Sequence, residues 1–201
     1  MSQELERLLK DIRACRLCTD LPLGPRPVLH VQASARILIV GQAPGTRVHA
    51  TGQSWNDPSG DRMRRWMGID RATFYDESKI ALASMAFCYP GKAKRGDLPP
   101  RPECAPHWRE KLHAHLPNIQ LTLLFGQYAQ AWYLGKRRGK TLAETVAKWQ
   151  DYMPEFLPLP HPSPRNIRWF QRHPWVEADI VPALRERVHE LLELETPRKT
   201  A

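Results

Sequence analysis

Four short apolar runs, separated by longer amphipathic stretches, restrict the fold of this chain more than any other feature. The runs cover residues 37–40 (ILIV), 80–87 (IALASMAF), 121–125 (LTLLF) and, more weakly, 156–159 (FLPL). Continuous apolar runs of this length are typical of strands that are buried on both faces of a sheet. Because strands that alternate with helices form parallel sheets, the sequence predicts an α/β fold with ligands at the carboxyl ends of its strands.

Helical spacing of apolar residues marks the stretches around these runs. The expected helices lie within residues 1–18 and over 61–67, 106–116, 128–134, 141–151 and 182–194. Thr141, followed three residues later by Glu144, is typical of a capping box that begins a helix. We expect one domain over residues 1–194 and a frayed tail over residues 195–201.

Length and charge exclude several classes of protein. The 201 residues are too few for a long multidomain machine, and no apolar run approaches the about 20 residues of a membrane-spanning helix. Since the N-terminus also lacks the apolar stretch of a secretory signal, we expect a cytoplasmic monomer without membrane contact. Lys and Arg number 30 against 21 Asp and Glu, a net charge of +9. This excess is typical of domains that bind nucleic acid, although a merely basic soluble protein has the same balance.

The chain contains four cysteines, at positions 15, 18, 88 and 104. An even number of cysteines in a cytosolic protein indicates metal or redox chemistry more often than disulfides. A thioredoxin-type use of Cys15 and Cys18 requires a preceding strand, whereas a helix is expected there. A four-thiolate iron-sulfur cluster tolerates irregular spacing, zinc stays possible, and four free buried cysteines are the plain alternative.

Two loop motifs, GQAPG at residues 41–45 and HPSPRN at residues 161–166, accompany the cysteines. With these motifs in this order, the chain resembles the uracil-DNA glycosylase superfamily over residues 12–190, and most closely its iron-sulfur branch, family 4. The resemblance implies a single three-layer α/β/α domain with a central, mostly parallel four-stranded sheet. It also implies a DNA repair hydrolase that removes uracil to leave an abasic site, with a 4Fe-4S cluster, or alternatively zinc, on Cys15, Cys18, Cys88 and Cys104.

Further positions match the family pattern. Gly52 and Gly60 fall on the first and last glycines of the family's second block, and Trp55 falls on its Phe. Residues 83–88 correspond to the family strand that ends at the third cysteine, and the fourth cysteine follows sixteen residues later, as in the family.

Other positions depart from the pattern. Gln42 replaces the acid of the first motif, Val48 and His49 replace an acidic pair, and Ser84 replaces the Asn that reads uracil. These departures leave alternatives open: a glycosylase for another deaminated base such as hypoxanthine, a non-catalytic binder of damaged or single-stranded DNA, and an unrelated zinc-stabilised nucleic-acid-binding protein.

Cleavage of an N-glycosidic bond places negative charge on the departing base, and His161 is the expected donor to that charge. Gln42 can orient the attacking water but cannot deprotonate it, which is enough for a dissociative transition state that needs little base strength. Where a true base is required, His49 and Asp57 are the candidates. His161 has an alternative structural reading beside two prolines, and Asp57 is equally suited to a turn or a helix cap.

The substrate-binding candidates surround these groups. Trp55 is expected to stack on the flipped base, with a core Trp as the alternative. The small residues Gly41, Ala43 and Gly45 permit close approach of the backbone to the substrate. The remaining candidates are Ser84 and, in the HPSPRN loop, Ser163, Arg165 and Asn166. The basic and aromatic stretch 161–175 and the basic loop 92–101 are expected to contact phosphates, or alternatively to be solvated basic loops.

Overall fold

The computed structural model describes residues 3–94 and 96–194, and the tail expected over 195–201 lies outside these residues. Its centre is a parallel four-stranded sheet in the order β2-β1-β3-β4. The strands are β1 (Ile37–Val40), β2 (Ile80–Leu82), β3 (Leu121–Phe125) and β4 (Phe156–Leu159). The predicted α/β class and the positions of all four strands are confirmed.

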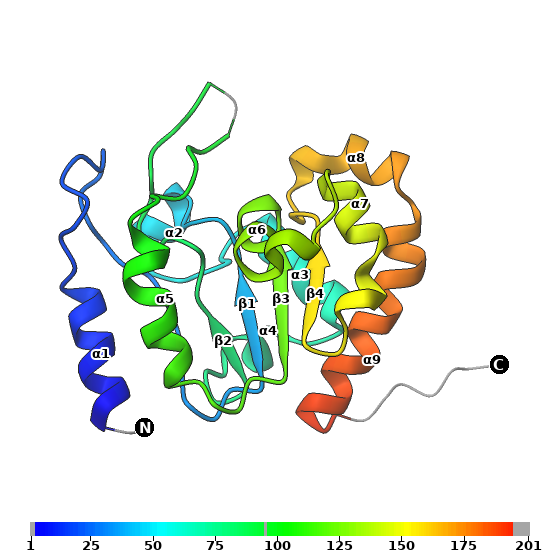
Figure 1. Ribbon diagram of the computed structural model, residues 1–201, viewed down its shortest axis with the longest axis horizontal. Helices are drawn as coiled ribbons and strands as arrows, with labels where there is room; N and C mark the ends of the chain where they lie inside the picture. Colours follow the sequence, from blue (N-terminus) through cyan, green and yellow to red (C-terminus); the bar gives the residue numbers. More distant parts are fainter. Residues whose placement is uncertain (1–2, 95, 195–201) are drawn as a thin grey trace.

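Helices cover both faces of the sheet because side chains alternate along each buried strand. Ile37 and Ile39 pack into one apolar cluster with α3 (Pro58–Met67) and α9 (Val181–Leu192), whereas Leu38 and Val40 pack into another. The second cluster includes α1 (Gln3–Arg13), α5 (Cys104–Ala114) and α6 (Gln127–Leu134). Figure 1 shows α5 and α9 on opposite sides of the sheet, which confirms the three-layer arrangement.

Several shorter elements complete the fold. They are α2 (Thr46–Thr51), α4 (Arg71–Tyr75), α7 (Leu142–Ala147), α8 (Ile167–Arg172), 3-10 turns at Gly135–Arg137, Trp149–Tyr152 and Pro164–Asn166, and a π-helical turn at Val176–Ile180. The predicted cap is confirmed, because the Glu144 backbone N–H donates to Oγ1 of Thr141 (3.1 Å). The helix expected over 141–151 divides into α7 and the 3-10 turn. None of the helices in the described part of the chain has the length and apolar character needed to cross a membrane.

The run over residues 80–87 is a regular strand only as far as Leu82, so the predicted strand was too long. The next segment still follows the β1 strand, because the N–H groups of Ala83 and Met85 donate to the carbonyls of Ile39 (3.1 Å) and Gly41 (2.9 Å). On its other side the buried Arg109 guanidinium donates to the carbonyls of Ala83 and Ser84. A side chain therefore replaces a ladder partner here, and the strand that the family resemblance implies over 83–88 is irregular backbone.

Candidate active site

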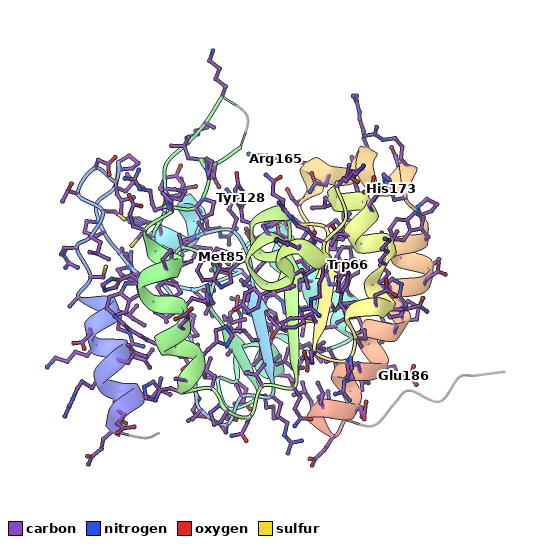
Figure 2. All side chains as sticks on the ribbon, in the orientation of Figure 1. Trp66, Met85, Tyr128, Arg165, His173 and Glu186 are labelled. Carbon is purple, nitrogen blue, oxygen red and sulfur yellow. The ribbon has the colours of Figure 1, made fainter. Side chains whose placement is uncertain are left out.

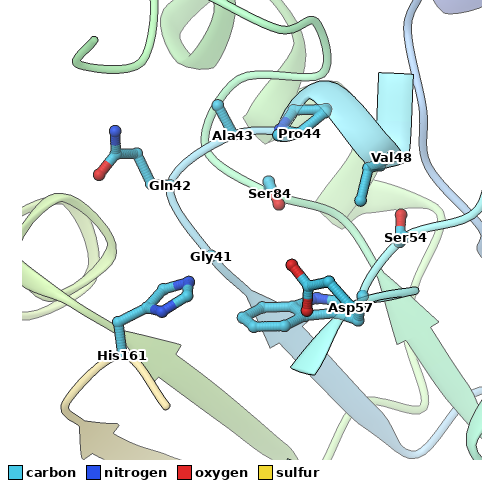
Figure 3. A pocket seen from close by; sticks show the side chains of 11 residues that line it. Gly41, Gln42, Ala43, Pro44, Val48, Ser54, Asp57, Ser84 and His161 are labelled. Atoms are coloured by element: carbon cyan, nitrogen blue, oxygen red, sulfur yellow. The ribbon is translucent and has the colours of Figure 1, made fainter. Parts of the chain in front are cut away.

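A pocket lies at the carboxyl ends of the strands, where the loops that follow β1, β2 and β4 meet (Figure 3). It is lined by Gly41, Gln42, Ala43, Pro44, Gly45, Val48, Ser54, Trp55, Asp57, Ser84 and His161. The pocket thus gathers three of the four predicted catalytic residues and five of the predicted substrate contacts. The sequence motifs indicated this edge because ligands of parallel sheets bind there.

Trp55 forms an apolar wall of the pocket and is also part of the core, as the alternative interpretation predicted, and its stacking on a flipped base stays a prediction. Its side chain is 8% exposed, and its ring centroid lies 5.3 Å from that of Phe125 and 5.4 Å from that of His161. The Trp55 backbone has φ 56°, a left-handed conformation that is costly for a bulky residue. The fold holds it there: Arg64 Nη1 donates to the Trp55 carbonyl (3.4 Å). A Cβ on Gly60 would lie 1.8 Å from the same oxygen, so position 60 requires glycine.

Gly41 lies directly against this indole. A Cβ at position 41 would lie 2.9 Å from Cζ2 of Trp55, closer than real Cβ contacts permit. At Gly45, in the same loop, the nearest atom would be an Asp97 carboxylate oxygen at 3.6 Å, an ordinary contact. A side chain at position 41 would therefore clash with the Trp55 ring, whereas a methyl group at position 45 would fit.

We expect Gly41→Ala to lower kcat/KM about tenfold and stability by about 1–3 kcal/mol, because the methyl group displaces the pocket wall. The measurement is thermal unfolding together with release of uracil from an oligonucleotide, the reaction that the resemblance implies. Gly45→Ala is the matched control for stability and should keep the Tm close to wild type, because a Cβ there makes only an ordinary contact. Equal losses of stability in the two variants would contradict a specific role for the contact between Gly41 and Trp55.

His161 faces the pocket from the loop after β4. Burial lowers the pKa of His161, and the neighbouring Asp57 carboxylate opposes this shift. The ring is therefore neutral near pH 7 and offers one N–H donor. The loop that carries His161 is held by Nδ2 of Asn166, which donates to the His161 carbonyl (2.8 Å).

Asp57 has two contacts of different kinds. Its Oδ1 accepts from the Gly60 N–H (2.9 Å) and so caps α3, as one sequence interpretation predicted. Its carboxylate also points into the pocket in Figure 3 and is close enough to His161 to influence the imidazole pKa. The cap fixes the acid in place because one oxygen is tethered to the start of the helix.

Gln42 lines the pocket with its backbone, but its amide points outward (Figure 3). Nε2 of Gln42 donates to the carbonyl of Leu98 at 2.7 Å, in a loop that follows the third cysteine. The side chain therefore has a structural partner outside the pocket.

The other predicted residues lie outside the pocket lining. His49 is on α2, with its ring 6.2 Å from the Tyr89 ring. Ser163 accepts from the Arg165 N–H (3.2 Å), an internal bond of its own loop, and the Arg165 side chain is exposed. The roles given to His49, Ser163, Arg165 and Asn166 thus remain predictions.

Asp97 was missed by the sequence interpretation. Its carboxylate lies beside Gly45 at the rim of the pocket. Burial raises the pKa of Asp97, and Arg165 and Lys92 oppose this rise. No local sequence signal marks this position, because Asp97 reaches the pocket only through the fold of its loop.

The four cysteines line a second pocket between the end of α1, the segment after β2 and the start of α5. Burial raises the pKa of Cys88 to about 11 and of Cys104 to about 12, and neighbouring thiols contribute to both shifts. Over residues 3–94 and 96–194, no three His, Cys, Asp or Glu side chains form a group that could hold a metal ion. The fold therefore brings the thiols together around a common space without a preformed single-ion site.

The chain was compared with protein-family models and with solved structures. The family model of the uracil DNA glycosylase superfamily matches residues 29–185, which include the GQAPG loop, the pocket and His161. A structure solved in solution by NMR, of a candidate uracil DNA glycosylase from Methanosarcina acetivorans, is 16% identical and superposes with a TM-score of 0.48. The match covers 80% of this chain and 96% of that one. At that TM-score the family assignment rests on the family model, which spans well over half of the residues. The chain belongs to the uracil DNA glycosylase superfamily.

Proposed function

We propose that this protein is a monofunctional glycosylase that hydrolyses the N-glycosidic bond of uracil in DNA and leaves an abasic site. The observation that carries the proposal is the neutral His161 imidazole and the Asp57 carboxylate in one pocket beside the Trp55 ring. The superfamily assignment supports a DNA substrate and glycosylase chemistry.

Each side chain has a role that follows from the charges of the reaction. A base inside a duplex is unreachable, so the target nucleotide is flipped into the pocket, where the Trp55 wall contacts it. As the bond breaks, negative charge grows on the base and the His161 N–H stabilises it. Positive charge grows on the sugar, which the Asp57 carboxylate stabilises while it accepts a proton from the attacking water.

Ser84 favours a second candidate substrate. It lines the pocket in the position where the resemblance implies a uracil-reading Asn, and its Oγ would lie 3.4 Å from a Cβ on Gly41. A carboxamide presents a fixed donor and acceptor, whereas a hydroxyl rotates to either role. A hydroxyl therefore discriminates less strictly between bases, and hypoxanthine is the second candidate.

The test is an end-labelled oligonucleotide with one central uracil or hypoxanthine, in single- and double-stranded form, followed by alkaline cleavage. Protein purified without air is used, so that any oxygen-sensitive cofactor survives. Cleavage at uracil supports the leading proposal, and cleavage at hypoxanthine alone favours the second candidate. Binding without cleavage of either base contradicts both.

We also propose that the four cysteines hold a 4Fe-4S cluster of structural function, as in the iron-sulfur branch of the family. All four thiols line one pocket, although no three are close enough for a single ion. Sulfur ligands of a cluster surround iron and sulfide atoms and lie farther apart than ligands of one metal ion. The Arg101 charge lowers the pKa of Cys18 and the Arg109 charge lowers that of Cys104, in each case against the rise that burial causes, so both arginines favour the thiolate form that a cluster requires.

We expect Cys88→Ser to lose bound iron and sulfide and to lower the Tm, because one missing thiolate opens the set. Metal analysis, visible absorption and thermal unfolding measure this. Every cysteine of the chain belongs to the set, so the control is Leu17→Ala, an exposed residue that lines the same pocket, and this variant keeps all four thiols and both arginines. Stoichiometric zinc without sulfide would show that the four cysteines hold zinc and not an iron-sulfur cluster. An unchanged metal content in Cys88→Ser would exclude the four-cysteine site.

A further inference from the structure

Residues 91–94 and 96–98 form the two arms of a hairpin, called the 91–98 hairpin below, that projects beyond the carboxyl edge of the sheet (Figure 1). Lys92 and Asp97 pair in antiparallel fashion, and the Leu98 N–H donates to the Gly91 carbonyl (2.9 Å). Gly91 (φ 115°) and Gly96 (φ 80°) supply left-handed backbone that L-residues rarely adopt. Backbone pairing therefore defines the shape of the hairpin, and its Asp97 lies beside Gly45 of the pocket lining.

The hairpin and the HPSPRN loop form a cationic rim. Lys92, Lys94 and Arg165 are exposed, and none lies within salt-bridge distance of a carboxylate in the described part of the chain. A Cβ on Gly96 would lie 3.8 Å from Nη1 of Arg165, so the two elements approach each other. Figure 2 shows Arg165 at the same edge as the hairpin. Lys92 and Arg165 are near enough to Asp97 to oppose the rise of its pKa, but neither forms a salt bridge with it. Exposed cations that form no salt bridge are suited to backbone phosphates.

Gln42 joins this hairpin to the pocket. Its Nε2 donates to the Leu98 carbonyl (2.7 Å), and Leu98 is the residue that closes the hairpin onto Gly91. The bond requires a donor at position 42. A carboxylate there has no proton to give and would face the carbonyl oxygen, so an acid at this position would repel the hairpin.

We propose that Gln42 is a positioning residue that fastens the cationic 91–98 hairpin to the pocket loop, and that the hairpin and Arg165 bind DNA phosphates beside the flipped nucleotide. The proposal rests on the proposed function for its DNA substrate. The proposal explains why residue 42 is an amide where the family motif has an acidic residue. Gln42 holds the phosphate-binding hairpin, and Asp57 supplies the carboxylate that accepts a proton from the attacking water.

The test compares Gln42→Met, Gln42→Glu and the double variant Lys92→Ala/Lys94→Ala. Fluorescence anisotropy measures binding of a uracil-free duplex over a range of salt concentrations, and limited trypsin digestion measures cleavage after Lys92 and Lys94. Gln42→Met removes the donor without adding charge. It should weaken duplex binding about tenfold, speed cleavage in the hairpin, and affect Kd more than the single-turnover rate. The double variant should reduce the slope of log K against log salt by about 1.8, at about 0.9 per phosphate contact.

Four results would overturn the proposal. Three of them are unchanged digestion and binding in Gln42→Met, an unchanged salt slope in the double variant, and a large fall in the single-turnover rate of Gln42→Met with unchanged Kd. The fourth is a higher single-turnover rate in Gln42→Glu, which would mean that the side chain at position 42 activates the attacking water. Binding and digestion do not require catalysis, so a wild-type protein that releases no base would contradict the proposed function without changing these readouts.

Discussion

We expect His161→Ala to lower the single-turnover rate of uracil release about 10²- to 10³-fold, the scale of losing one preorganised donor to a developing anion. The structure gives the reason: the imidazole faces the pocket, and its loop is held by the Asn166 bond to the His161 carbonyl. The loss should appear in the maximal rate, because the N–H meets full negative charge only in the transition state.

The pH profile provides a second readout for the same residue. Since burial lowers the pKa of His161, the neutral ring persists as the pH falls below about 6.5, the ordinary value for His. The acid limb that belongs to His161 should therefore lie below that pH. His115→Ala, at the C-terminal cap of α5, is the control for a general effect of losing a histidine. A His161→Ala rate within threefold of wild type would remove His161 from the reaction.

The strands were predictable because a strand buried on both faces needs an apolar residue at nearly every position. The helices α2, α4 and α8 were missed because five or six residues are too few for helical periodicity to appear. The end of β2 at Leu82 was hidden for another reason: its determinant is Arg109, a buried side chain about 25 positions away in the sequence.

The candidate site was predictable where its residues follow strands directly. Gly41, Ser84 and His161 meet because the carboxyl ends of parallel strands share one edge. The outward direction of Gln42 and the arrival of Asp97 at the rim depend on the 91–98 hairpin, whose path over the pocket is a tertiary feature. Asp57 could be named from the sequence as a cap or as a base, but only the fold places one carboxylate in both positions.

Asp57 both caps α3 and lines the pocket, and a mutation can separate these two roles. A carboxylate that only caps α3 is replaced well by Asn, because Asn is an equally good N-cap and its Oδ1 can accept the Gly60 N–H. A carboxylate that accepts a proton from water, or stabilises a positive sugar, cannot be replaced by a neutral amide. Asn at position 57 therefore keeps the cap and removes the charge.

We expect Asp57→Asn to lower the single-turnover rate about 10²-fold, within the usual range for losing a general base, while the Tm stays close to wild type. Asp70→Asn is the matched control: Asp70 caps α4 by accepting the Thr73 N–H (2.7 Å) and does not line the pocket. That variant should keep the wild-type rate. If Asp57→Asn also keeps it, Asp57 is a cap alone and the water is activated elsewhere, with the Asp97 carboxylate at the rim as the next acid to replace.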